Sequence, residues 1–133
     1  MTLSGAETDH YDKNLIRISG PVAIEAVGDR ILNQDVTEAL AFLPNGFVDL
    51  LILDPPYNIN KTFNSTTFKK TSIAQYAEWF EGMLVRLLPT LKQAASVYVC
   101  SEWYSSTAIH LVLNKFLKVR NRITWEREKG RGA

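Results

Sequence analysis

A carboxylate, two prolines and a tyrosine follow one another at residues 54–57, within the stretch LILDPPYNIN. The preceding segment, FVDLLIL at residues 47–53, is almost continuously apolar, which predicts a strand covered on both faces as in a parallel sheet. An unpaired charge after a buried strand is costly and usually has a partner or a task. Asp54 is therefore a candidate functional group, while a proline pair that ends the strand in a rigid turn is the simpler interpretation.

The residue types of this turn suit the activation of an exocyclic amine on a nucleobase. The lone pair of such an amine is delocalised into the ring, so a catalyst has to aim two acceptors at the two amino hydrogens. The Asp54 carboxylate and the Pro55 carbonyl can be these acceptors, and Pro55 and Pro56 restrict the backbone that carries the carbonyl. Tyr57 offers a flat face on which a base extruded from a duplex can stack. The reaction that fits is methyl transfer from S-adenosyl-L-methionine, to which positioning contributes most of the remaining catalysis.

The elements that must position this turn alternate along the chain. Strands are expected at residues 15–19, 47–53 and 96–101, and residues 29–35 are expected to form a strand that leads into a loop. A last strand is expected within residues 119–128, and helices are expected at residues 36–44, 72–89 and 107–117. This alternation is typical of βαβ units and predicts an α/β fold with a parallel sheet. Ligands bind beyond the carboxyl ends of the strands in such sheets. Asp35, Asp54 and residues 101–104 are therefore expected to share one edge, with the polar residues 62–71 as a loop long enough to move.

The helix over residues 72–89 has the clearest signal. Ser72 lies three residues before Gln75, which is the spacing of a capping box. The apolar stripe that follows at helical intervals consists of Ile73, Tyr76, Phe80, Met83, Leu84, Leu87 and Leu88. In the later helix the expected inner residues are Ile109, Leu113, Phe116 and Leu117.

Composition limits the function classes. The chain has 133 residues, enough for one domain or part of one, and 46% hydrophobic residues, enough to bury a core. Fifteen Lys and Arg against 14 Asp and Glu neither require nor exclude a nucleic-acid partner. Cys100 is the single cysteine and the chain has two histidines, so we expect no intramolecular disulfide and no metal site. Without an N-terminal signal sequence or an apolar membrane span, the expected location is the cytoplasm.

The motif DPPYN, with NQD about twenty residues upstream and a polar loop after it, resembles the amino-methyltransferases that modify adenine N6 or cytosine N4 in DNA. The stretch LNQDVTEALAFLPNGFVDLLILDPPYNINKTFN resembles more closely the permuted beta class of bacterial site-specific DNA methyltransferases, in which the catalytic half precedes the cofactor half. The resemblance covers roughly residues 29–132, and Asp54, Pro55, Pro56 and Tyr57 match the catalytic motif residue by residue. It implies a Rossmann-like methyltransferase fold, S-adenosyl-L-methionine as cofactor and DNA as partner.

The resemblance also implies residues for the cofactor and a preference among bases. Asp35 is expected near the adenosine moiety, although it is equally suited to cap the helix that begins near Val36. Asp54 and Asn58 are expected beside the cofactor, with a simple turn role as the alternative for Asn58. An Asp in the first motif position favours adenine N6 over cytosine N4, because the cytosine enzymes more often have Ser there.

Further residues around this edge are weaker candidates. Residues in or beside the loop and near the C-terminus are candidates for contacts with the extruded strand or its phosphates, and ordinary surface roles are the alternative. These residues are Phe63, Lys69, Lys70, Arg127, Lys129 and Arg131. Glu102, Trp103 and Tyr104 follow a strand end and suit a wall of the base pocket, but a core position is favoured for Trp103.

One expected part is missing. Relatives hold the methionine part of the cofactor with a glycine-rich FxGxG loop, whereas the GxG of this chain, at residues 130–132, lies in a basic segment after the last expected strand. We therefore expect residues 1–14 to form a flexible arm and residues 15–133 to form an incomplete catalytic part with little activity alone. A homodimer or a complementary methyltransferase half would then be its partner. The alternatives are a non-catalytic fragment that binds nucleic acid or a partner chain, and an enzyme acting on RNA or protein amide nitrogen.

Overall fold

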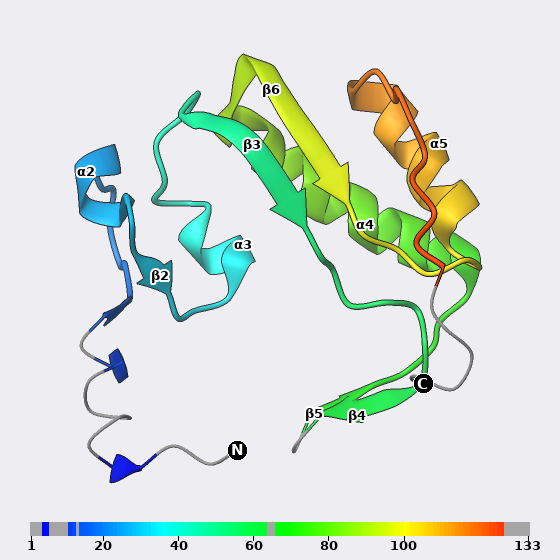
Figure 1. Ribbon diagram of the computed structural model, residues 1–133, viewed down its shortest axis with the longest axis horizontal. Coiled ribbons are helices and arrows are strands. Elements are labelled where there is room, and N and C mark those ends of the chain that lie inside the picture. The colour runs from blue at the N-terminus through cyan, green and yellow to red at the C-terminus, as the bar shows by residue number, and fades with distance from the viewer. Residues whose placement is uncertain (1–3, 6–10, 13, 64–65, 127–133) are drawn as a thin grey trace.

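The computed structural model describes residues 4–5, 11–12, 14–63 and 66–126 (Figure 1). Its strands are β1 (Leu15–Ile16), β2 (Ile31–Leu32), β3 (Val48–Leu53), β4 (Lys61–Phe63), β5 (Thr66–Phe68) and β6 (Leu91–Val99). Its helices are α2 (Ile24–Val27), α3 (Val36–Ala39), α4 (Ile73–Leu87) and α5 (Ser106–Phe116), and a short 3₁₀ turn, η1 (Leu88–Thr90), follows α4. Across these residues no helix is both long and apolar enough to span a membrane.

The strands pair in three separate two-stranded sheets. β1 pairs with β2 and β3 pairs with β6, both in parallel, whereas β4 and β5 form an antiparallel hairpin. The parallel pairs and the intervening helices confirm the α/β class. The expectation that all parallel strands share one sheet is wrong for the residues described here, because the N-terminal pair β1–β2 lies apart from β3–β6 (Figure 1).

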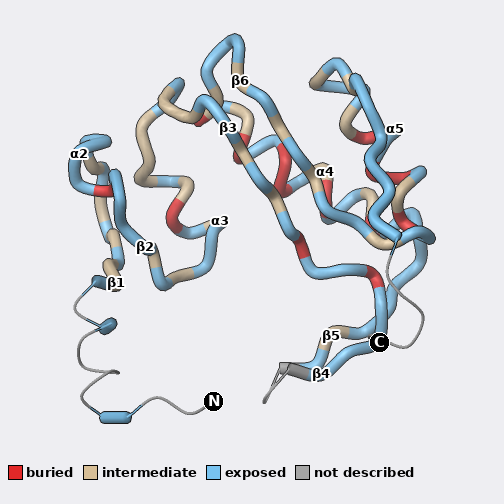
Figure 2. Tube along the Cα trace, in the orientation of Figure 1, coloured by how far each residue is buried: buried red, intermediate tan, exposed pale blue. Residues whose placement is uncertain are grey.

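The core lies between the β3–β6 pair and the helices α4 and α5. Its buried residues come from one face of each helix: Tyr76, Phe80, Met83, Leu84, Leu87, Ile109 and Val112. Leu51, Leu53 and Val99 pack against them from the strands. Figure 2 shows most of the buried segments on α4 and α5. The apolar period of the sequence therefore predicted the α4 face correctly, except that Ile73 is exposed.

Only one face of the β3–β6 pair is covered in the described structure. Successive side chains of a strand point to opposite faces, so Leu51 and Leu53 face the helices while Leu50 and Ile52 face away. Ile52 is 68% exposed, and Tyr98 lies opposite it on β6. The prediction of a strand buried on both faces is therefore wrong for this structure, because α4 and α5 cover the same face of the β3–β6 pair.

Several predicted boundaries also differ. The loop predicted at residues 62–71 overlaps the β4–β5 hairpin, which begins at Lys61, and the helix predicted at residues 36–44 ends at Ala39. The strand predicted at residues 119–128 is absent from residues 119–126, which have no regular secondary structure, and the rest of it lies outside the described residues. Most of the predicted arm, residues 1–14, and the GxG segment also lie outside them.

Helix α4 begins with the capping box that the sequence predicted. The Ser72 hydroxyl accepts a hydrogen bond from the Gln75 N–H at 3.2 Å, and the Gln75 side-chain oxygen accepts one from the Ser72 N–H at 3.1 Å. These contacts satisfy two backbone donors that a helix start otherwise leaves unpaired. The start of α4 is thereby fixed directly after the hairpin.

Replacing Ser72 with Ala should lower the free energy of unfolding by about 1 kcal/mol, because the first turn of α4 loses its cap. Urea denaturation followed by circular dichroism measures the change. Ser101→Ala is the matched control, since Ser101 is exposed and lies outside the helices. Equal denaturation midpoints for the two variants would show that the cap adds nothing.

Candidate active site

The DPPY turn leaves β3 beside the end of β6. The Cys100 N–H donates to the Leu53 carbonyl at 2.8 Å, which extends the pairing to the last residue of β3. Asp54 and residues 101–104 therefore lie at one edge, as predicted. Asp54 itself is exposed, so the expectation of a charge desolvated by a buried strand is wrong. The buried residue of the turn is Pro55, which keeps the backbone in place while the carboxylate remains accessible.

A hydrogen bond from α4 holds the second proline. The Tyr76 hydroxyl donates to the Pro56 carbonyl at 3.0 Å, from a tyrosine that is otherwise part of the core. Burial raises the pKa of Tyr76 to about 12, with smaller contributions from the nearby Glu102 and Tyr57 side chains. The phenol therefore remains protonated, and a donor, well above neutral pH. Sequence periodicity predicted Tyr76 as a core residue and missed this hydroxyl contact.

Asn58 connects the turn to the start of α4. Its side chain is buried, with 4% exposure. Its amide group donates to the Thr71 carbonyl at 3.0 Å, and its oxygen accepts from the Thr71 N–H at 2.8 Å. The neighbouring Asn60 oxygen accepts from the Lys70 N–H at 2.8 Å. These contacts join the segment before β4 to the segment after β5 and so close the base of the hairpin. The DPPY turn is thereby held next to the start of α4.

Tyr57 lies between Pro56, which Tyr76 holds, and Asn58, which Thr71 holds. It is 36% exposed, so its ring is partly accessible to a ligand. Pro56 is exposed as well. The candidate catalytic residues thus combine a rigid backbone with an accessible carboxylate and an accessible ring. Lys69 is exposed beside the hairpin, while the Phe63 side chain lies outside what the structure describes.

Asp35 caps α3. Its Oδ1 accepts from the Thr37 N–H at 2.8 Å and from the Thr37 hydroxyl at 2.5 Å. These hydrogen bonds lower the pKa of Asp35, with a further contribution from the positive charge of Arg86. The capping role considered from sequence is therefore confirmed. Asp35 follows β2, in a different sheet from Asp54, whereas Arg86, whose positive charge contributes to the lowered pKa of Asp35, lies on α4.

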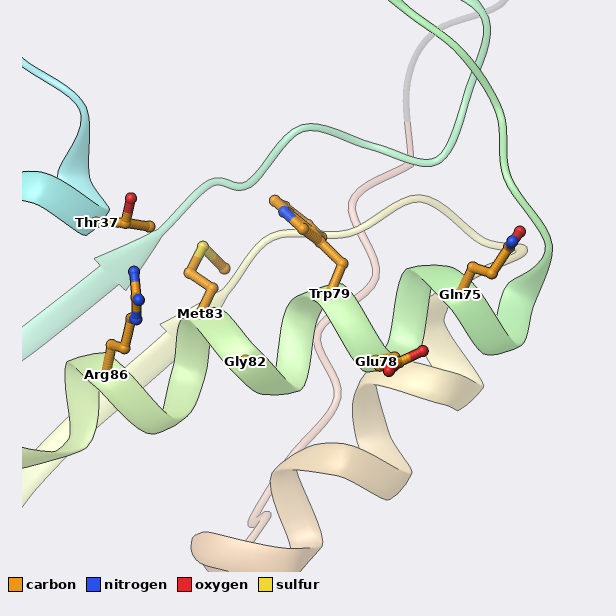
Figure 3. Close-up of a pocket in the computed structure, with 7 residues that line it drawn as sticks. All are labelled: Thr37, Gln75, Glu78, Trp79, Gly82, Met83 and Arg86. Atoms are coloured by element: carbon orange, nitrogen blue, oxygen red, sulfur yellow. The ribbon is translucent and has the colours of Figure 1, made fainter.

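A groove of about 470 Å³ runs along α4 beside Thr37. Figure 3 shows the side chains of Arg86, Met83 and Trp79 on the side of α4 that faces Thr37. Gln75, Glu78 and Gly82 complete its lining. No sequence pattern singled out this groove, because Trp79 and Arg86 fall between the positions of the apolar stripe.

The turn before α5 presents aromatic residues to solvent. The Glu102 carboxylate accepts from the backbone N–H groups of Tyr104 and Ser105, the latter at 2.8 Å, and so satisfies the start of α5. Trp103 and Tyr104 are 72% and 73% exposed. The core position predicted for Trp103 is therefore wrong, since the chain reverses here outside the packed layer.

Replacing Tyr76 with Phe removes the donor to Pro56 and keeps the ring. We expect a loss of about 0.5–1.5 kcal/mol in the free energy of unfolding near neutral pH. The folded phenol ionises at about pH 12 and an ordinary phenol at about pH 10. Its contribution to stability is therefore present below pH 10 and is lost between pH 10 and pH 12. Urea denaturation across this range, with absorbance titration of phenolate, measures both effects.

Tyr98→Phe is the control for this titration, because Tyr98 is an exposed tyrosine on the open face of β6. The Tyr76 variant should lack the phenol that ionises at about pH 12, and the control should retain it. A phenol that still ionises at about pH 12 in the Tyr76 variant would contradict the assignment.

Comparison with known proteins identifies the family. A family model described as DNA methylase matches residues 48–133. The chain is 27% identical over 101 residues to the type II methyltransferase M.BamHI of Bacillus amyloliquefaciens, covering 76% of this chain and 24% of that protein. It is 28% identical over 112 residues to the type II methyltransferase M.BglII of Bacillus subtilis, covering 77% and 30%. It is 27% identical over 95 residues to the DNA adenine methyltransferase YhdJ of Escherichia coli, covering 71% and 32%.

No solved structure matches the chain. The chain spans between about a quarter and a third of the length of these relatives. The family match includes β3, the turn at residues 54–57, α4, β6 and α5, and the relatives named here are all methyltransferases. The resemblance found in the sequence is thereby confirmed at family level: this chain belongs to the DNA methylase family.

Proposed function

We propose that this chain supplies the amine-binding part of an active site that transfers a methyl group from S-adenosyl-L-methionine to N6 of adenine in DNA. The observation that carries the proposal is the DPPY turn, in which an exposed carboxylate follows a paired strand and the next residues are fixed by Tyr76 and Asn58. Membership of the DNA methylase family supports the same reaction class.

The contacts around the turn assign separate tasks to its residues. The Tyr76 hydroxyl occupies the Pro56 carbonyl, so the Pro55 carbonyl and the Asp54 carboxylate are the two acceptors for the amino hydrogens. Accepting both hydrogen bonds localises the lone pair of the amine on nitrogen. That nitrogen would form the new N–C bond as the C–S bond of the sulfonium breaks and its electron pair stays on sulfur. The proton released from nitrogen leaves through the Asp54 carboxylate to solvent, because Asp54 is exposed. Tyr57 stacks on the ring of the base.

Adenine is preferred to cytosine in this proposal because of the aspartate in the first motif position. The name of the relative YhdJ, DNA adenine methyltransferase, supports this choice. N4 of cytosine is the alternative, since the same two acceptors serve either amine. The cytoplasm is the proposed location of this activity.

The proposal gives the described residues contacts with one part of the cofactor only. Asp35 is proposed to accept from the ribose hydroxyls, and the adjoining groove offers the flat ring of Trp79 to the adenine. Asn58 is proposed to act indirectly, because its carboxamide is already bonded to Thr71. When bound, the cofactor supplies an activated methyl group. Among the described residues, no glycine-rich turn joins a strand to a helix, so none of them fits the methionine part.

Because contacts are proposed with one part of the cofactor only, the described residues are proposed to form an incomplete catalytic unit. Residues 15–133 are proposed to be the catalytic part of a Rossmann-like methyltransferase domain, with residues 1–14 as an arm. Residues 1–133 by themselves are proposed to transfer methyl groups slowly or not at all. The complete product of the reading frame that contains them is the form in which activity is to be measured.

In that complete product, Asp54→Ala should reduce methyl transfer to adenine by about 10²–10³-fold in kcat, because one acceptor for the amine is lost. Transfer of a labelled methyl group from S-adenosyl-L-methionine to duplex DNA measures the effect. Parallel reactions with RNA and protein, and digestion of the DNA to nucleosides, separate the possible acceptors.

Asp49→Ala is the matched control. Asp49 is an exposed aspartate of β3, the strand that precedes Asp54, and it forms a surface salt bridge with Lys92 at 2.7 Å. Its loss should leave kcat unchanged. Retained activity in the Asp54 variant would refute the assigned role, and N4-methylcytosine as the product would refute the adenine preference.

The partners proposed for the chain are DNA and either a second copy or a complementary methyltransferase half. Support for a protein partner comes from the open face of the β3–β6 pair, defined by Leu50, Ile52 and Tyr98. Burial of these apolar side chains would gain roughly 25 cal/mol per Å². Association through this face would also give β3 the second covered side that its sequence predicts.

Ile52→Lys should therefore weaken self-association of residues 1–133, since a charge would be placed on the open face. Sedimentation velocity over a range of protein concentrations measures this. Ile31→Lys is the control, because Ile31 is similarly exposed but lies on β2. A parent protein that remains monomeric would leave the complementary half as the proposed partner, and equal effects of both variants would exclude the open face.

A further inference from the structure

The two exposed aromatic residues before α5, Trp103 and Tyr104, have no role in the mechanism above. They follow the end of β6, at the edge where β3 delivers Asp54. Both rings are more than two-thirds exposed, although adjacent large aromatic side chains are normally buried at least in part. Neither ring contributes to the core. Packing in the core therefore does not explain these two aromatic side chains, whereas binding of a ligand next to the candidate site does.

Each of the two rings has a cation beside it. The Lys70 ammonium lies 5.0 Å from the centroid of the Tyr104 ring, and the Arg122 guanidinium lies 4.7 Å from the centroid of the Trp103 ring. Within the described ranges, the salt bridges are Lys92–Asp49 and Lys115–Glu81, so neither cation is neutralised by one. The one carboxylate of the turn, Glu102, is occupied by backbone N–H groups at the start of α5.

This surface is connected to the DPPY turn through the closed base of the hairpin. The backbone of Lys70 is bonded to Asn60, and that of the next residue, Thr71, is bonded to Asn58. The Lys70–Tyr104 contact therefore joins the segment after the DPPY turn to the segment after β6. A ligand seated on the two aromatic rings would lie along the same edge as a base held at Asp54.

Aromatic rings with adjacent cations are the combination that binds unpaired nucleic acid. Bases stack on the rings and the cations pair with phosphates, with little dependence on base identity. A duplex does not offer its bases in this way until a nucleotide has been extruded, which also unstacks its neighbours. The arrangement of Trp103, Tyr104, Lys70 and Arg122 therefore suits the strand on either side of an extruded nucleotide.

We infer that Trp103 and Tyr104 stack on the nucleotides that flank the target base, while Arg122 and Lys70 pair with their phosphates. This inference rests on the proposed function, because it takes the extruded base at Asp54 as its starting point. It assigns positioning of the DNA strand to the turn before α5, separately from recognition of the amine at the DPPY turn.

Binding of single-stranded DNA to residues 1–133 tests the inference directly. Fluorescence anisotropy of a labelled single-stranded oligonucleotide is compared with that of the same sequence as a duplex. Trp103→Ala and Tyr104→Ala should each weaken single-strand binding by about 5- to 140-fold, the fold-change that corresponds to loss of one stacked base. Trp103→Phe and Tyr104→Phe should retain most of the affinity, because a stacking face remains.

Tyr98→Ala is the matched control, since Tyr98 is an exposed aromatic residue of the open sheet face. It should bind like the parent. Arg122→Gln and Lys70→Gln should each make the negative slope of log affinity against log salt concentration shallower by about 0.7. These variants keep both rings and so provide an independent measurement should an alanine variant unfold.

Unchanged single-strand affinity in folded Trp103→Ala and Tyr104→Ala proteins would overturn the inference, as would equal losses in the Tyr98 control. A change in self-association without a change in DNA binding would show instead that the rings contact protein. Failure of the proposed function is distinguishable: single-strand binding would then depend on these rings, while the complete product would transfer no methyl group to DNA.

Discussion

Packing of α4 against one face of the β3–β6 pair is the interaction on which the rest of the described structure depends. Phe80 and Leu84, both completely buried, lie at its centre, and α5 packs on the same side. The hydrophobic gain from this contact fixes the direction of α4 relative to the strands. The N-terminal end of α4 consequently lies beside the carboxyl ends of β3 and β6, where the candidate active site is built.

Polar contacts then transfer this rigidity from the core to the turn. Tyr76 belongs to the core through its ring and to the site through its hydroxyl, which holds the Pro56 carbonyl. Asn58 performs the corresponding task on the other side of Tyr57 by bonding to the backbone of Thr71. The exposed carboxylate of Asp54 thus projects from a backbone that is fixed at several points. Such preorganisation is what the activation of a weakly nucleophilic amine requires.

The sequence was informative wherever a strong local pattern agreed with the tertiary structure. The period of apolar residues and the Ser72–Gln75 spacing predicted α4 closely, and the run before Asp54 predicted β3. Exposure was predicted less well. The apolar run of β3 does not show which layer is present to cover it, so Ile52 was expected to be buried, and Trp103 was assigned to the core by its residue type alone.

The candidate site shows the same division. Asp54, Pro55, Pro56 and Tyr57 were found from their order in the sequence, because the chemistry depends on adjacent residues. The hydroxyl contact of Tyr76 and the Lys70–Tyr104 contact join positions that are 20 and 34 residues apart, so only the fold reveals them. Polar residues at the ends of the loop, Asn58 and Asn60, were visible in the sequence, but their partners were not.

The closed base of the β4–β5 hairpin also affects how the family can vary. Asn58 and Asn60 bond to the backbone of Thr71 and Lys70 and hold the two ends of the hairpin together. Lengthening a loop whose ends are already joined costs little, since the closure entropy grows only with the logarithm of its length. The hairpin is therefore a position where related chains can gain or lose residues, and hence acquire new contacts with a substrate, without moving the catalytic turn.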